Sequence, residues 1–134
     1  MDDSIGKRFI DAWNSHDEAR ITALCTAEVT YEDVAMGKVC IGHDDLKAFV
    51  REGGSDFRFV TLSEQAGTDR YAIEWECEGR HTGSVPGFPA TNKPFRFRGA
   101  SIGRLDAHGK ILENRDYWNL ADFMAQVGSP PTPS

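Results

Sequence analysis

The chain has 134 residues, of which 40% are hydrophobic and 27% charged, and its formal net charge is −6. This length and composition predict one folded domain with a single core and exclude a disordered chain. The negative balance argues against nucleic-acid binding, which needs clustered lysine and arginine side chains. No apolar run reaches the length of a membrane span, and the start MDDSIGKRF lacks an apolar signal region. We therefore expect a cytoplasmic protein with no nucleic-acid or membrane partner.

Neither the cysteines nor the histidines form a recognisable motif. The three cysteines are odd in number and widely spaced, without a CxxC pair, which favours reduced, buried thiols. The four histidines show no HxxxH spacing, so we expect no metal site. The chain also lacks a GxGxxG segment and a P-loop, and therefore we expect no nucleotide cofactor.

The first half of the chain favours helices. Apolar residues from Ile5 to Trp13 recur at three- and four-residue steps, which predicts a helix that ends at residues 14–17. Ser15 and Glu18 fit a capping box for a second helix, with Asp17 as the alternative cap, and we extend that helix to Cys25. A short strand follows at about 29–34. A third helix is predicted from Gly42 to the stop signal at residues 53–54.

From about residue 57 the hydrophobic period changes to two, which predicts strands. Apolar and charged residues alternate over 71–81 and again over 95–101, so each strand has one buried and one exposed face. Residues 106–109 predict a hairpin turn, and the last strand covers about 110–118. Asn119 caps a final helix that Gly128 closes. We interpret 1–128 as one domain and the Pro-rich residues 129–134 as a disordered tail.

This order of elements predicts the fold class. Three helices around one short strand, then an antiparallel meander and a last helix, are typical of an α+β fold. Glycines such as Gly99 and Gly103 allow long strands to curl. We expect a cone-shaped, curved antiparallel sheet wrapped by the N-terminal helices around a pocket, that is, an α+β barrel or cystatin-like roll. Such a pocket suits a hydrophobic small molecule.

Asp116 is the leading candidate for chemistry. Strand alternation places Leu112, Asn114, Asp116 and Trp118 on one face of the last strand, and the apolar ends of this set indicate the interior. A buried carboxylate is costly unless it is paired, and an apolar pocket raises its pKa toward the range of a general base. The alternative is a structural carboxylate that pairs with a buried arginine or caps a backbone group.

Two further polar residues are candidates of lower rank. Asp33 shares a strand face with Val29 and Tyr31 and could line the pocket, or it could simply form the following turn. His81 shares a face with Trp75 and Cys77 and could exchange a proton with an acid, or be a satisfied, half-buried histidine.

Aromatic side chains are the expected pocket wall. The segment GSVPGFPATNKP at 83–94 joins two strands and exposes Phe88, so it is either a lid over the pocket mouth or a dimer contact. The candidate substrate-binding residues are His81, Trp75, Phe9, Trp13, Tyr31, Phe49, Phe88, Phe97 and Trp118.

Several segments together resemble the SnoaL-like polyketide cyclases, within the superfamily of nuclear transport factor 2 and ketosteroid isomerase. They are FIDAWNSHD, VTYED, IGHDDLKAF and GKILENRDYWNLADFMAQVG, and the resemblance covers about residues 5–128. It implies that Asp116 is the catalytic acid/base of the last strand, with Asn114 where the family often has histidine. Glu32-Asp33 matches the strand end that carries the base of steroid isomerases, and Phe9 falls at the position of their tyrosine. The resemblance also implies a homodimer formed through the sheet.

The resulting hypothesis is cofactor-free acid/base catalysis on a hydrophobic keto or polycyclic molecule. Asp116 would act as the base, Asn114 would donate a hydrogen bond to the developing oxygen charge, and Asp33 would be a second pocket carboxylate. One alternative is a non-catalytic ligand-binding or dimeric interaction domain of the same fold. Another is a hydrolase that activates water between Asp33 and Asp116.

Overall fold

A computed structural model describes residues 4–54, 56–83 and 89–128. Its elements in chain order are α1 (Ile5–Ser15), α2 (Glu18–Thr22), β1 (Cys25–Asp33), β2 (Lys38–Ile41), α3 (Gly42–Glu52), β3 (Phe57–Ala66), β4 (Arg70–Arg80), β5 (Pro94–Leu105), β6 (Ile111–Trp118) and α4 (Leu120–Val127). No helix within these ranges is long and apolar enough to cross a membrane. The predicted tail, 129–134, lies outside the described residues.

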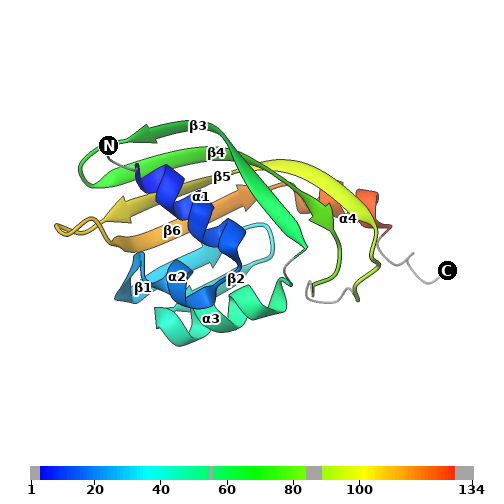
Figure 1. Ribbon diagram of the computed structural model, residues 1–134, viewed down its shortest axis with the longest axis horizontal. Helices are drawn as coiled ribbons and strands as arrows, with labels where there is room; N and C mark the ends of the chain where they lie inside the picture. Colours follow the sequence, from blue (N-terminus) through cyan, green and yellow to red (C-terminus); the bar gives the residue numbers. More distant parts are fainter. Residues whose placement is uncertain (1–3, 55, 84–88, 129–134) are drawn as a thin grey trace.

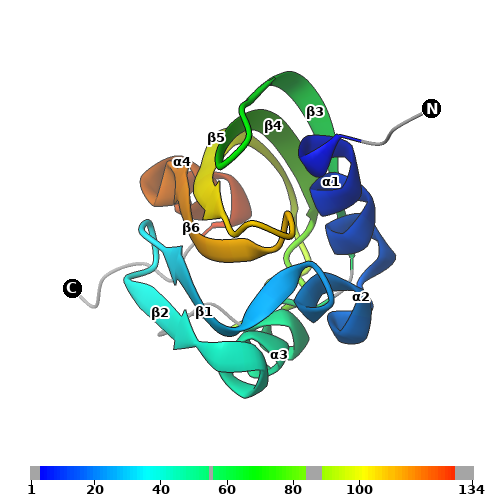
Figure 2. The same ribbon diagram turned by 90° about the vertical axis from the view of Figure 1, so that its left-hand side faces the viewer.

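The strands form one curved, unclosed sheet in the order β2-β1-β6-β5-β4-β3 (Figure 1). Neighbouring strands pair antiparallel except β1 and β6, which run parallel. Seen from the end, the sheet curls around an interior that α1, α2 and α3 border on the other side (Figure 2). The described residues therefore confirm the α+β class and the curved sheet, while β2 and β3 remain as its two edges.

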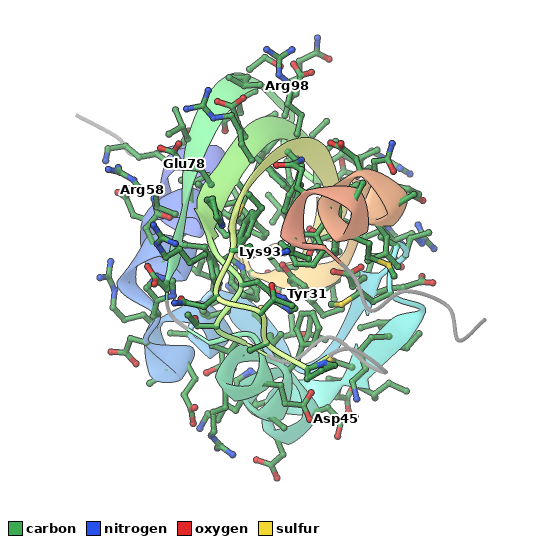
Figure 3. The ribbon with its side chains drawn as sticks, turned by 90° about the vertical axis from the view of Figure 1, so that its right-hand side faces the viewer. Tyr31, Asp45, Arg58, Glu78, Lys93 and Arg98 are labelled. Atoms are coloured by element: carbon green, nitrogen blue, oxygen red, sulfur yellow. The ribbon has the colours of Figure 1, made fainter. Side chains whose placement is uncertain are left out.

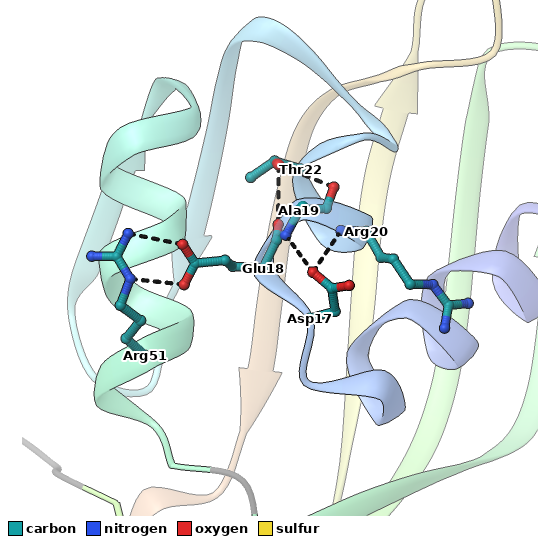
Figure 4. A network of polar contacts seen from close by, with 6 residues as sticks. All are labelled: Asp17, Glu18, Ala19, Arg20, Thr22 and Arg51. Atoms are coloured by element: carbon teal, nitrogen blue, oxygen red, sulfur yellow. Dashed lines mark hydrogen bonds and ion pairs between the residues drawn. The ribbon is translucent and has the colours of Figure 1, made fainter.

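The helices begin and end largely where the sequence predicts, with one exception at α2. Asp17 caps α2, because its Oδ1 accepts hydrogen bonds from the backbone N–H groups of Ala19 and Arg20 (Figure 4). Ser15 does not cap α2, since its hydroxyl donates to the carbonyl of Ala12. The guanidinium of Arg51 in α3 binds Glu18 with two hydrogen bonds of 2.7 and 2.8 Å, which joins α2 to α3.

Three sequence-based predictions of local structure are wrong. Cys25 begins β1 and does not extend α2, because α2 ends at Thr22. The edge strand β2 was not predicted, since its four residues are too few to show an alternation. Leu112 points outward and is 37% exposed, because it is an extra residue between the β5–β6 pairs Arg104–Glu113 and Leu105–Ile111. The bulge reverses the alternation, so buried Ile111 takes the inward position.

Two glycines of β5 make room for the aromatic rings of β4. A Cβ added at Gly99 would collide with the indole of Trp75, and one at Gly103 would collide with the phenol of Tyr71. The two rings therefore lie directly over the backbone of β5, and their polar ends reach the strand's inner side. This close approach positions two donors of the site described below.

Candidate functional site

A cavity of about 300 Å³ opens between the inner face of the sheet and the helices. Its wall is mainly aromatic, and the rings pack against one another, as between Phe97 and Trp118 with centroids 4.7 Å apart. Figure 3 shows Tyr31 in the enclosed interior and Arg98 on the outer surface. Eight of the predicted substrate-binding residues line this cavity: Phe9, Trp13, Tyr31, Phe49, Trp75, His81, Phe97 and Trp118. The ninth, Phe88, lies outside the described residues.

Asp116 lines the cavity with a half-buried carboxyl group. Its Oδ1 accepts a hydrogen bond of 2.6 Å from the hydroxyl of Ser101 on β5 and one of 2.8 Å from the amide of Asn114. Desolvation raises the pKa of Asp116 from its ordinary 3.8 to about 7, although Ser101, Asn114 and Tyr31 lower it by hydrogen bonding. The carboxyl group is therefore poised to hold or release a proton near neutral pH.

The donors to Asp116 are themselves oriented by aromatic residues of β4. The indole Nε1–H of Trp75 donates to Ser101 Oγ at 2.9 Å, so the Ser101 hydroxyl proton is left to point at Asp116. The hydroxyl of Tyr71 donates to Asn114 Oδ1 at 2.7 Å, which directs the Asn114 amide toward Asp116. Both chains end on Oδ1, and neither hydrogen bond engages Oδ2. A proton taken up by Asp116 is therefore best placed on Oδ2.

Tyr31 and Tyr71 remain protonated beside Asp116. Burial raises the pKa of both phenols above their ordinary value, and the nearby charge of Asp116 raises them further. Tyr31 also lines the cavity, whereas Tyr71 contacts Asp116 only through Asn114. The two hydroxyl groups therefore act as neutral donors.

Asp33 is the second carboxyl group of the cavity. The parallel pairing of β1 and β6 places Asp33 opposite Asp116 in register. Both carboxyl oxygens of Asp33 accept from the Trp118 indole, at 3.0 and 2.9 Å, and Oδ1 also accepts from the Met36 backbone N–H. Desolvation raises the pKa of Asp33, while the hydrogen bonds from Trp118 and Met36 oppose that rise. Asp33 is thus anchored by donors, and its charge contributes to the raised pKa of Asp116.

Asn114 occupies a different place from the one its predicted role requires. It is 1% exposed and does not line the cavity, and its amide is engaged by Asp116 and Tyr71. An amide so placed orients Asp116, and a hydrogen bond to a substrate oxygen does not fit its position. The predicted closeness of Asn114 to Asp116 is present, and the predicted hydrogen bond from Asn114 to a substrate oxygen has no support in this geometry.

The family described as SnoaL-like polyketide cyclase matches residues 4–127. The chain belongs to this family. Among curated proteins none matches significantly.

Solved structures of other proteins share the fold of this SnoaL-like protein. A SnoaL-like polyketide cyclase candidate from Jannaschia sp. CCS1 superposes with a TM-score of 0.80 at 16% identity, covering 98% of this chain and 99% of that one. A hypothetical protein with a ketosteroid isomerase-like fold from Catenulispora acidiphila, in complex with trimethylamine, gives 0.76 at 23% identity, covering 94% and 95%. The epoxide hydrolase/cyclase-like enzyme SalBIII, described for pyran ring formation in salinomycin, gives 0.70 at 17% identity, covering 85% and 87%.

Sequence reasoning missed several members of the SnoaL-like site. Ser101 and Tyr71 were assigned to inward strand faces but to no role, although the alternation that buries Phe97 and Trp75 also turns them inward. Met36, Phe57, Phe59 and Phe123 also line the cavity. These residues come close to Asp116 because strands that are distant in the sequence pair in the sheet. The pattern of residues within one strand does not show that pairing.

Proposed function

We propose that this SnoaL-like protein is a cofactor-free enzyme that uses Asp116 as a general acid and base on a hydrophobic keto or polycyclic small molecule. The observation that carries the proposal is a carboxyl group with a pKa of about 7 on the wall of an aromatic cavity. Near neutral pH both protonation states of such a group are populated, as proton transfer in both directions requires.

The proposed reaction begins with removal of a proton α to a carbonyl group. The C–H bond electrons form an enolate, and the proton goes to Asp116 Oδ2, the oxygen that receives neither the Ser101 nor the Asn114 hydrogen bond. The enolate carbon then adds to a second carbonyl carbon of the substrate to close a ring, or the enolate shifts a double bond or expels hydroxide. Asp116 returns its proton to the new alkoxide oxygen, to carbon or to the leaving oxygen, respectively. No redox change and no external acceptor are needed.

A donor for the developing oxygen charge is also at hand. Tyr31 lines the cavity, stays protonated and lies within hydrogen-bonding range of Asp116. A neutral hydroxyl fixed beside the base is suited to stabilise an enolate oxygen. We assign this role to Tyr31 in place of Asn114.

The experiment is α-proton exchange in D₂O, followed by NMR, with 2-tetralone as the probe. We expect the wild type to accelerate exchange and Asp116→Asn to reduce that acceleration by about 10²- to 10⁴-fold, the usual value of a positioned base. Asp33→Asn is the matched control, since it removes the neighbouring cavity carboxylate that is already bound by donors. We expect it to retain most of the activity.

Exchange that is equal in wild type and Asp116→Asn would contradict the proposal. It would favour a non-catalytic ligand-binding domain, in which Asp116 only orients the ligand. The acceleration should also rise with pH through about 7, because the base must be ionised to accept a proton.

A second candidate reaction is supported by the register of Asp33 opposite Asp116. Two carboxyl groups on adjacent paired strands could hold a water molecule between them and direct it at an epoxide. The measurement is hydrolysis of styrene oxide in H₂¹⁸O, which places one ¹⁸O in the diol. If both Asp33→Asn and Asp116→Asn abolish diol formation, the hydrolase proposal stands, and if wild type forms no labelled diol it fails.

A homodimer through the sheet stays a prediction. The outer face carries exposed apolar side chains, namely Val60, Leu62, Ile102 and Tyr117. These are compatible with a contact between sheets, and sedimentation velocity of the wild type tests it.

A further inference from the structure

His81 lines a different part of the cavity wall from Asp116. It directly follows β4, is 3% exposed and lines the cavity, and its ring packs edge-on against Phe123 with centroids 5.3 Å apart. Its backbone N–H binds the carbonyl of Lys93, whereas Asp116 pairs with Ser101. Lys93 and Ser101 are eight residues apart, with Phe97 between them, so His81 and Asp116 contact different parts of the cavity wall. One small functional group therefore cannot contact both side chains.

The contacts of His81 define which ring nitrogen carries the proton. The backbone N–H of Thr91 donates to His81 Nδ1 at 3.3 Å, and a backbone N–H cannot accept. The Thr91 hydroxyl lies 3.2 Å from the same nitrogen. Burial lowers the pKa of His81, so the ring is neutral at neutral pH. With Nδ1 as the acceptor, the proton lies on Nε2.

That Nε2–H group has no partner. Among the described residues, His81 Nε2 is the one buried side-chain nitrogen or oxygen without a hydrogen bond. Buried polar groups are nearly always paired, and an exception needs a reason. The Ser101 hydroxyl and the Trp118 indole N–H, which also line the cavity, already donate to Asp116 and Asp33. A ligand oxygen in the cavity would satisfy the remaining donor.

We propose that His81 is a ligand-binding residue whose Nε2–H donates a hydrogen bond to a carbonyl oxygen of the substrate, remote from the carbon that Asp116 deprotonates. The substrate is then an elongated aromatic molecule with two oxygen functions, one beside His81 and one beside Asp116, such as a polycyclic ketone or quinone. This inference rests on the proposed function, because it takes the same cavity to be the substrate site.

The first measurement is made on the free protein. A long-range ¹H–¹⁵N NMR spectrum of ¹⁵N-histidine-labelled wild type, compared with His81→Gln for assignment, identifies the tautomer of His81. We expect the proton on Nε2 and a low pKa. A proton on Nδ1 would overturn the proposal, since the free donor would then be absent.

The second measurement compares the binding of 9-fluorenone and fluorene, which differ only by a carbonyl group in place of a methylene. The quantity compared is the ratio of the dissociation constant of fluorene to that of fluorenone. We expect this ratio to be about 3- to 10-fold larger for wild type than for His81→Phe, which is the effect of one net hydrogen bond. His81→Gln should restore the preference, because its amide nitrogen lies near the position of Nε2. Thr91→Val is the matched control and should keep it, since the backbone N–H that fixes the tautomer remains.

Two results would overturn the proposal: equal affinity of wild type for the two compounds, including no detectable binding of either, or an unchanged preference in His81→Phe. If His81→Phe fails to fold, as judged by its thermal unfolding, the tautomer spectrum and His81→Gln decide. Asp116→Asn should keep the fluorenone preference. A further outcome is that wild type fails to accelerate α-proton exchange and still prefers fluorenone to fluorene in a way that depends on His81. That combination of results would reject the proposed catalysis by Asp116 and leave the proposed role of His81 in place.

Discussion

The two faces of the sheet carry similar polar groups in opposite electrostatic settings. On the outer face, carboxylates pair with arginines across the strands, as in Glu78–Arg96 at 3.0 Å and Glu76–Arg98 at 3.8 Å. The arginine side chains are exposed and the glutamates partly so. On the inner face, the hydrogen-bond donors to Asp116 are neutral, and the charge that acts on it is that of another carboxyl group, Asp33. Water screens charges on the outer face, whereas desolvation dominates on the inner face and moves a pKa by several units.

Among the ion pairs of the described residues, none joins an arginine to Asp116. An arginine beside Asp116 would hold its pKa low and leave a permanent anion, which is a weak base. Neutral donors such as Ser101 stabilise the carboxylate without removing its affinity for a proton. The fold therefore places ion pairs on the outer face of the sheet and neutral donors around the carboxyl group that lines the cavity.

The largest expected effect comes from removing the charge of Asp116 on the inner face. A carboxyl group with a pKa of about 7 when folded and 3.8 when unfolded binds more protons in the folded state between these values. The free energy of unfolding of wild type therefore falls as pH rises from about 4 to 7, by on the order of 4 kcal/mol from this group. Asp116→Asn avoids that cost, so we expect it to be more stable than wild type at pH 8 and similar near pH 4.

Urea unfolding of both proteins at several pH values measures this difference. A stability difference that does not change with pH would show that Asp116 is ionised throughout. The inner face would then resemble the outer one.

A smaller effect is expected from Ser101→Ala, which removes one donor to the same carboxyl group. Because the Ser101 hydrogen bond lowers the pKa of Asp116, we expect the pKa of Asp116 to rise by about one unit, to above 7. The measurement is the ¹³C carboxyl shift of Asp116 during a pH titration. Ser63→Ala is the control on exposed β3, where the hydroxyl donates to Glu74 at 3.2 Å, and it should leave the Asp116 titration unchanged.

The smallest effect is expected on the outer face. Glu76→Gln breaks the pair with Arg98, and we expect the free energy of unfolding to change by less than about 1 kcal/mol, less still at high salt. Urea unfolding at low and high salt gives this value. If Glu76→Gln changed the free energy of unfolding as much as Asp116→Asn does, the two faces of the sheet would not differ electrostatically.

Local patterns in the sequence were sufficient to identify most elements and the residues that face inward. The steps of three and four in α1 and the alternation in β4 and β5 are properties of neighbouring residues, and the structure confirms them. The inward position of Asp116 was predicted in part from Leu112, which the bulge turns outward, so one premise of that prediction was wrong. The alternation of apolar and polar residues does not reveal a single extra residue in a strand.

The chemistry of the site was decided by contacts between residues far apart in the chain. Parallel pairing of β1 with β6 places Asp33 opposite Asp116, and the rings of Tyr71 and Trp75, lying over glycines of β5, aim their donors at Asn114 and Ser101. The sequence alone determined that Asp116 is an interior carboxyl group on the last strand. Only the tertiary structure decided that its hydrogen-bond donors are neutral and that its pKa lies near 7, because desolvation and hydrogen bonding depend on what surrounds a group in space.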